Sequence, residues 1–142
     1  MTDRTASAVW QGDLQGGSGT IAAAPSGAFG ALDVTWASRT EEPNGRTSPE
    51  ELIASAWAAC FAMSVSNVLA KAGTPPDRVE TSATVTFQPG QGIIKGALTV
   101  RGTVTGLDAD GFSAAAEDAM QNCPVSKALA GIPDVSLEAT LA

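Results

Sequence analysis

The chain has 142 residues, of which eight are basic and fifteen are acidic, so its net charge is −7. This length predicts a single domain, residues 1–142, with a hydrophobic core, and the negative charge argues against nucleic acid and anionic membrane surfaces as partners. The sequence contains no histidine, the usual general base and nitrogen ligand, so we expect no metal site. The first seven residues contain no apolar stretch of signal-peptide length, so we expect a cytoplasmic protein in a reducing compartment.

Short extended stretches separated by glycine open the chain and predict an antiparallel meander. They are residues 6–10, 20–24 and 31–37. Residues 38–48, SRTEEPNGRTS, are polar and typical of a loop. The motif SPEE at residues 48–51 places serine at an N-cap and proline at the first helical position. It predicts a helix that runs to about residue 72, before Gly73 and two prolines.

The second half of the sequence predicts a hairpin, one or two helices and a final strand. Residues 79–87 and 93–104 alternate apolar and polar side chains on either side of the turn QPGQG. Residues 108–122 carry apolar side chains at helical spacing, and Pro124 follows Cys123 directly, so Cys123 should lie at a helix junction. Residues 125–130 can add a helical turn, and 135–142 close the chain as a strand. The order β-β-β-α-β-β-α-β is an α+β fold.

The first predicted helix contains a long segment without charge. From Leu52 to Ala70 there are nineteen residues and no Asp, Glu, Lys or Arg. Many of them are alanine or serine, so the segment is only weakly hydrophobic and we expect no membrane span. A domain of this size can hardly enclose such a helix on every side. We therefore expect a homodimer with this helix near its centre.

Cys60 and Cys123 are the only two cysteines of the chain. A cysteine within an uncharged helix, like Cys60, is most often an inert core residue. The sequence Cys123-Pro124 at the start of a turn leaves free backbone N–H groups near the sulfur, which favours the thiolate. The spacing alone does not decide between two core thiols and a redox pair.

Two segments, TSPEELIASAWAACFAMSVS and QNCPVSKAL, together resemble the osmotically inducible / organic hydroperoxide resistance proteins, the OsmC/Ohr family. The shared features are a Pro-Glu helix start, a cysteine ten residues after that glutamate, and a later Cys-Pro. VWQGDLQGGSGTI and WASRTEEPNGRTSPEEL also fall in the expected order, so the resemblance covers nearly the whole chain. It implies an antioxidant thiol peroxidase of the stress response, which acts on organic hydroperoxides. It also implies an intertwined homodimer of α+β subunits without metal or organic cofactor.

The resemblance implies roles for individual residues. Cys60 matches the peroxidatic cysteine, Cys123 the resolving cysteine and Glu50 the active-site carboxylate. Arg39 matches the arginine that precedes the helix in the osmotically inducible branch, to which we assign the chain. One extra residue lies between this arginine and the helix, and Arg46 in the same loop is the alternative.

The residue types fit peroxide chemistry. Thiolate is the nucleophile, and a nearby arginine can lower a thiol pKa by about one to three units. Glu50 precedes Cys60 by ten residues, about 15 Å of helix, so we expect it to meet the Cys60 of the other subunit and to orient the arginine there. The predicted cycle forms a Cys60 sulfenic acid and then a Cys60–Cys123 disulfide. An external dithiol, which family membership suggests to be a lipoylated protein, would reduce the disulfide.

Apolar neighbours of Cys60 predict a preference for alkyl or lipid hydroperoxides over hydrogen peroxide. The candidates for substrate binding are Trp57, Phe61 and Met63, each with core packing as the alternative. Position 57 is often histidine or tyrosine in the relatives. Two other functions stay open: a non-catalytic dimer that binds a small apolar ligand, with thiols inert to peroxide, and a thiol redox sensor that oxidises without fast turnover.

Overall fold

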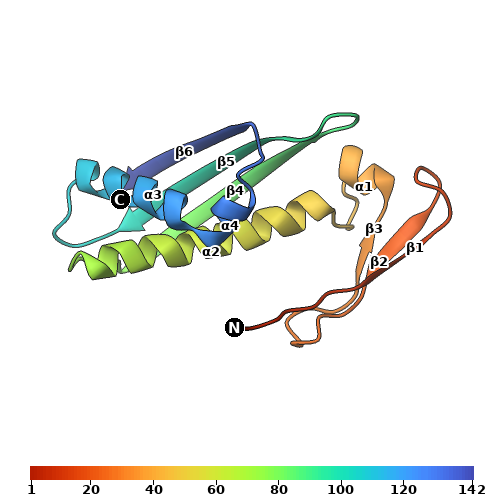
Figure 1. The fold of residues 1–142 in the computed structure, drawn as a ribbon, viewed down its shortest axis with the longest axis horizontal. Coiled ribbons are helices and arrows are strands. Elements are labelled where there is room, and N and C mark those ends of the chain that lie inside the picture. Colours follow the sequence, from red (N-terminus) through yellow and green to blue (C-terminus); the bar gives the residue numbers. More distant parts are fainter. The chain divides into compact units, whose positions relative to one another are not determined.

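A computed structural model describes residues 1–142, and its elements follow the predicted α+β order with one further helix between the third strand and the long helix. The chain divides into two units, which are described separately. Unit 1 comprises Met1–Leu52 and unit 2 comprises Ile53–Ala142. The long helix α2 (Pro49–Lys71) begins in unit 1 and continues in unit 2 (Figure 1).

Unit 1 is built on a three-stranded antiparallel sheet. Its strands are β1 (Ala8–Gln11), β2 (Ser18–Ile21) and β3 (Leu32–Val34), in the order β1-β2-β3. The predicted meander is therefore confirmed, although each strand is shorter than predicted.

A short helix, α1 (Trp36–Thr40), follows β3 where the sequence predicted the end of a strand and a loop. The prediction was wrong here because Thr35 and Ser38 cap each other. The Thr35 hydroxyl accepts a hydrogen bond from the Ser38 backbone N–H at 3.0 Å, and the Ser38 hydroxyl accepts one from the Thr35 N–H at 2.9 Å. This reciprocal capping satisfies two N–H groups and begins a helix from a segment with strand-like composition.

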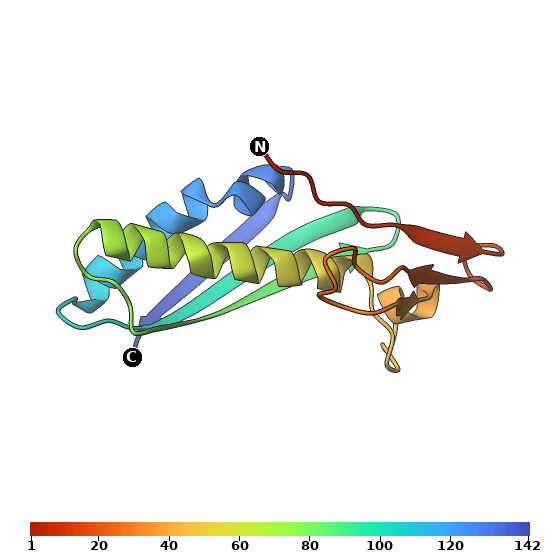
Figure 2. The same cartoon turned by 90° about the horizontal axis from the view of Figure 1, so that it is seen from below.

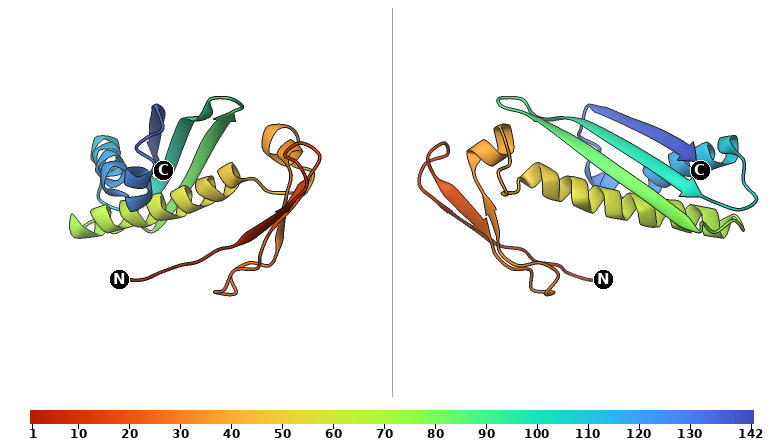
Figure 3. Two further views of the ribbon diagram at one scale, coloured as in Figure 1. Left: turned by 45° about the vertical axis from the view of Figure 1, so that its right-hand side comes forward. Right: turned by 180° about the vertical axis from the view of Figure 1, so that it is seen from behind.

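Unit 2 is a three-stranded sheet with all its helices on one face. The hairpin strands β4 (Arg78–Gln88) and β5 (Gly92–Thr103) pair antiparallel, as predicted. After β5 the chain forms α3 (Ala109–Asn122) and α4 (Pro124–Ala128), and β6 (Asp134–Leu141) then pairs parallel with β5. Figure 3 shows the outer face of this sheet without a helix over it.

The core of unit 2 lies between the sheet and α2, α3 and α4 (Figure 2). A stripe of α2 side chains at four-residue spacing is fully buried: Trp57, Phe61, Val65 and Leu69. The Thr81 hydroxyl donates a hydrogen bond to the Ala58 carbonyl at 2.8 Å and so joins α2 to β4. The opposite face of α2 is uncharged and exposed, and Met63 on it is 73% exposed.

Two glycines of β5 let aromatic rings lie directly on the strand. A Cβ atom at Gly96 would come 2.6 Å from the Trp57 ring, and one at Gly102 would come 2.3 Å from the Phe112 ring. Both distances are too short for any side chain. These glycines therefore fix where α2 and α3 pack on the sheet.

By length and composition α2 is also the one helix of the chain that could cross a membrane. Core helices of globular proteins pass the same test, and α2 buries one stripe of side chains against the sheet of unit 2.

Candidate active site

Unit 1 holds a partly buried ion pair between Arg39 of α1 and Glu50 in the first turn of α2. The Arg39 Nε lies 3.0 and 3.1 Å from the two Glu50 carboxylate oxygens, and a terminal guanidinium nitrogen lies 2.7 Å from Oε1. The Glu50 side chain is 8% exposed and that of Arg39 is 29% exposed. Arg39 also lies 5.8 Å from the centre of the Trp36 ring. Such a pair holds the guanidinium plane in one orientation.

The segment between α1 and α2 is folded back so that these two side chains meet. The Ser38 hydroxyl donates to the Thr47 carbonyl at 2.8 Å, and the Thr47 N–H donates to the Asp33 carbonyl at 2.9 Å. Ser48 caps α2 by accepting from the Glu51 N–H at 3.1 Å, as predicted from the SPEE motif. Since Ser38 and Thr47 are buried, these bonds are shielded from water.

Arg46, the alternative arginine, is exposed and lies elsewhere in unit 1. It lines a hollow of about 220 Å³ together with residues of β2 and β3. Of the two arginines, Arg39 is the one that the structure pairs with Glu50.

Unit 2 brings together the two cysteines, which are 63 residues apart in the sequence. The sulfur atoms of Cys60 and Cys123 are 3.1 Å apart, and both cysteines are free thiols. Cys60 lies in the middle of α2 and is partly buried, whereas Cys123 is fully buried. Cys123 is at once the C-cap of α3 and the N-cap of α4, the helix junction that the sequence predicted.

The surroundings shift the pKa values of the two thiols in opposite directions. Burial raises the pKa of Cys60, and the neighbouring Cys123 raises it further, although a hydrogen bond from the Val125 backbone N–H opposes this. Burial also acts to raise the pKa of Cys123, but the nearby N–H of Ser126, the Cys60 thiol, the Ser126 hydroxyl and the N–H of Val125 outweigh it, so the Cys123 pKa is lowered. Either thiol can donate in the sulfur–sulfur contact. The donors around Cys123 favour the form in which Cys60 keeps its proton.

A further hydrogen bond joins α2 to α4. The Trp57 indole N–H donates a hydrogen bond to the Ser126 hydroxyl oxygen at 2.7 Å. The sequence analysis did not identify Ser126. The signal for it was its place three residues after Cys123, one helical turn along the CPVS segment.

The three predicted substrate-binding residues are placed in two different ways. Trp57 and Phe61 are buried in the core of unit 2, at 1% and 0% exposure, while Met63 projects from the exposed face of α2. Within the single chain these side chains do not line a common cavity.

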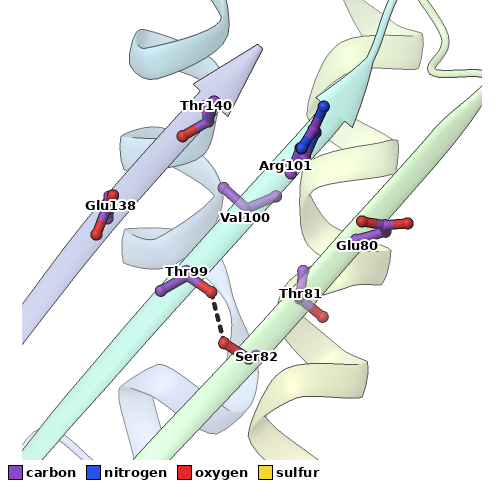
Figure 4. Close-up of a pocket in the computed structure, with 8 residues that line it drawn as sticks. All are labelled: Glu80, Thr81, Ser82, Thr99, Val100, Arg101, Glu138 and Thr140. Atoms are coloured by element: carbon purple, nitrogen blue, oxygen red, sulfur yellow. Dashed lines mark hydrogen bonds between the residues drawn. The ribbon is translucent and has the colours of Figure 1, made fainter. Parts of the chain in front are cut away.

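The hollows of unit 2 are not lined by either cysteine. One of about 330 Å³ is on the outer face of the sheet, where Glu80, Arg101 and Glu138 surround the hydrogen-bonded hydroxyls of Ser82 and Thr99 (Figure 4). Another, of about 300 Å³ and mostly apolar, is lined by Trp57 and by residues of α3, α4 and β6. No group of three or more His, Cys, Asp or Glu side chains is placed to hold a metal ion.

Comparisons with known proteins agree with the sequence resemblance. A family model described as OsmC-like protein matches residues 42–138. Peroxiredoxin OsmC of Escherichia coli (strain K12) is 38% identical over 123 residues, which are 84% of this chain and 85% of that protein.

Solved structures share the fold over the whole length. The organic hydroperoxide resistance protein OsmC from Legionella pneumophila has a TM-score of 0.69 and 25% identity, and the match covers 99% of both chains. An OsmC-like protein from Mycoplasma pneumoniae has a TM-score of 0.74 and 14% identity, and covers 99% of this chain and 98% of its own. The predicted α+β fold is therefore confirmed.

Proposed function

Because the chain belongs to the OsmC-like protein family and is a cysteine-based peroxidase, an oxidoreductase, we propose that it reduces organic hydroperoxides to alcohols with Cys60 and Cys123. The observation that carries this proposal is the 3.1 Å contact between the two sulfur atoms. Two thiols at this distance can form a disulfide with little movement of the backbone.

The proposed cycle has three steps. The Cys60 thiolate attacks the terminal oxygen of the hydroperoxide, the O–O bond breaks, and the alkoxide takes a proton and leaves as the alcohol. The Cys123 thiolate then attacks the sulfur of the Cys60 sulfenic acid, the S–O bond breaks, and the hydroxide takes a proton to become water. Finally, an external dithiol reduces the disulfide and is itself oxidised to a disulfide. For this reductant we propose a lipoylated protein, on the family resemblance.

Within one chain the surroundings of Cys60 disfavour the thiolate that the first step needs. Its pKa is raised, and none of the groups that shift it is a cation. We propose that Arg39 supplies the missing positive charge and that Glu50 holds its guanidinium toward Cys60. The partly buried bidentate pair in unit 1 supports this role, because an arginine so oriented loses little freedom when it binds an anion.

We infer that Arg39 and Glu50 of one subunit serve the Cys60 of a second copy of the chain. Glu50 and Cys60 are ten residues apart on α2, about 15 Å by the helical rise, which is further than a glutamate side chain reaches. The uncharged, exposed face of α2, with Met63 on it, supports a homodimer in which two such helices meet. Met63, Trp57 and Phe61 would then surround an alkyl or lipid hydroperoxide in the assembled dimer.

The first test counts thiols. We expect one equivalent of an organic hydroperoxide to remove both thiols of the reduced protein within seconds, faster than one equivalent of hydrogen peroxide does. In Cys60→Ala the one remaining thiol, Cys123, should persist. If both thiols persist with either oxidant, the protein is better explained as a dimer that binds a small apolar ligand. If they oxidise but added dithiol supports no repeated turnover, a redox sensor is the better explanation.

A second test addresses the shared site. A Cys60→Ala chain and a Glu50→Ala chain, each inactive as a homodimer, are mixed under conditions that exchange subunits. Each heterodimer should regain one intact site, so up to half of the mixed dimers' sites become active. An inactive mixture with proven heterodimers would show that each subunit uses its own Glu50.

A further inference from the structure

We propose that Trp57 and Ser126 are positioning residues, whose hydrogen bond keeps the sulfur of Cys123 beside Cys60 while the contact between the two sulfur atoms changes during the reaction. This inference rests on the proposed function for its use in the cycle, although its test needs no hydroperoxide. It assigns a role to a pair of side chains that takes no part in making or breaking covalent bonds.

Two side-chain contacts join α2 to the segment that carries Cys123. The sulfur atoms of Cys60 and Cys123 are 3.1 Å apart, and the Trp57 indole N–H donates to the Ser126 hydroxyl oxygen at 2.7 Å. Trp57 precedes Cys60 by three residues, and Ser126 follows Cys123 by three residues. The two contacts are therefore about one helical turn apart on each side. Together they restrict a rotation of α4 against α2 that one contact alone would allow.

The donor on α2 is held in one position. Trp57 is 1% exposed, and its ring lies on Gly96 of β5, where a Cβ atom would come within 2.6 Å of it. Such close packing on a strand leaves the indole few alternative rotamers. An indole nitrogen can only donate, so the Ser126 oxygen is the acceptor. The core thus presents a fixed N–H group to α4.

The acceptor lies on a helix that has little else to hold it. α4 has five residues, which is too short for a helix to be stable by itself. None of its residues is fully buried, and Val125 on it and Leu129 at its end are only partly buried against the core. The bond from Trp57 is therefore a substantial part of what docks α4.

The position of α4 matters for the direction of the Cys123 side chain. The Cys123 N–H donates to the Ala119 carbonyl at 2.8 Å, so α3 fixes the backbone before the sulfur-bearing carbon. After it the chain leaves the helical conformation, with φ −62° and ψ 122° at Cys123, and enters α4. Because the backbone on both sides sets where a side chain points, α4 helps to aim the sulfur at Cys60.

The contact between the sulfur atoms cannot maintain this geometry alone, because the reaction changes it. After the first step Cys60 is a sulfenic acid, which carries an oxygen atom where the thiol had a proton. The Cys123 thiolate must then approach the same sulfur and displace that oxygen. The bond between Trp57 and Ser126 is unchanged at each step. It therefore keeps the effective concentration of one sulfur at the other high throughout.

The hydrogen bond predicts a distinctive pattern among variants. Removing only the Ser126 hydroxyl leaves the buried indole N–H without an acceptor while α4 stays docked, and water reaches this N–H only when α4 moves away. Removing both partners leaves no unpaired group, so docking should largely recover. Ser126→Ala should therefore be harmful when Trp57 is present and nearly harmless in a Trp57→Phe background.

The experiment equilibrates the full chain with reduced and oxidised glutathione and measures the fraction of protein that has a Cys60–Cys123 disulfide. For Ser126→Ala we expect the effective concentration of the two thiols to fall roughly three- to tenfold. This makes the disulfide more oxidising by about 15–30 mV, at about 30 mV per tenfold. In the Trp57→Phe background the same substitution should change the effective concentration by less than about twofold.

Two further variants serve as controls. Ser126→Thr retains the hydroxyl and should keep the native equilibrium. Ser113→Ala removes a hydroxyl from an exposed position of α3 and should change nothing.

The outcomes separate this inference from the proposed function. If Ser126→Ala leaves the glutathione equilibrium unmoved, or shifts it equally with and without the indole, the positioning role is wrong. It is also wrong if the native protein forms no Cys60–Cys123 disulfide with oxidised glutathione. If the disulfide forms and the variants follow the expected pattern, but an organic hydroperoxide releases no alcohol, the positioning role stands and the proposed function is wrong.

Discussion

The two units of the chain stabilise their functional side chains by different means. Every fully buried apolar side chain belongs to unit 2, where the cysteines lie among aromatic and aliphatic groups. In unit 1 the buried side chains are polar, namely Ser38, Thr47 and Glu50. Hydrogen bonds and one ion pair, rather than an apolar core, therefore hold Arg39 and Glu50 in position.

Unit 1 also leaves apolar side chains exposed. Five large apolar side chains of unit 1 are at least 40% exposed, whereas unit 2 has only Met63 and Val135 in this class; the five are Met1, Val9, Trp10, Leu14 and Phe29. A unit with so little apolar burial gains little stability on its own. We propose that contact with another surface stabilises unit 1, and in the proposed dimer a second copy of the chain would provide that surface.

Removing the nucleophile should give the largest effect and tests whether unit 2 holds the chemistry. Cys60→Ser should reduce alcohol release to the uncatalysed rate because no thiolate remains at that position. Cys123→Ser should release one alcohol per chain and then stop, with Cys60 left as a sulfenic acid. Alcohol yield per chain is the measurement. Repeated turnover by Cys60→Ser would assign the nucleophile elsewhere.

Changes at Arg39 test whether unit 1 acts on the thiol of unit 2. If its guanidinium lowers the Cys60 pKa by about one to three units, Arg39→Ala should slow alcohol release roughly 10- to 1,000-fold at a pH below that pKa. The rate should recover as the pH rises, because the thiolate then forms without help. Arg39→Lys should recover only part of the rate, since it keeps the charge but loses the bidentate geometry.

Arg46→Ala is the matched control for this prediction, because Arg46 is exposed and does not contact Glu50. Loss of activity in Arg46→Ala with native activity in Arg39→Ala would exchange the roles of the two arginines.

A methyl group at Gly96 tests the tight packing of unit 2. Gly96→Ala would place a Cβ atom 2.6 Å from the Trp57 ring, so the indole must shift. We expect a loss of about 1–3 kcal/mol in the free energy of unfolding, measured with urea. Gly131→Ala, where the added atom meets open space, is the control. Equal stability of the two variants would show that the contact with the strand is not tight.

The smallest expected effect concerns the cap of α1 in unit 1. Thr35→Ala removes the acceptor for the Ser38 N–H and should cost about 1 kcal/mol of stability. Because Arg39 is on the same short helix, activity should fall along with stability. Thr5→Ala, at an exposed position outside the elements, serves as the control. Native activity and stability in Thr35→Ala would show that α1 does not depend on its cap.

The sequence predicted what depends on local pattern. Alternation in β4 and β5 and the SPEE start of α2 were sufficient to place those elements, and Pro124 was sufficient to place Cys123 at a junction. The helix α1 was missed because two hydroxyls capping each other outweigh the strand preference of the segment. Pairing of Arg39 with Glu50 needed the resemblance, since two charges eleven residues apart could as well be solvated.

Other features depend on contacts between distant residues and have no local signal. The parallel pairing of β6 with β5 follows from the crossover through α3 and α4. The hydrogen bond between Trp57 and Ser126 joins residues that are 69 positions apart in the sequence.

The contact between the two sulfurs also bears on how the oxidised protein is recognised. A disulfide needs the sulfur atoms about 1 Å closer than their separation of 3.1 Å. Side-chain rotation at a helix junction can supply that movement, so oxidised and reduced chains should have almost the same surface. A reductant could then not distinguish the oxidised from the reduced protein by shape. The distinction would come from the reaction itself, in which the thiolate of the reductant attacks a disulfide sulfur but not a free thiol.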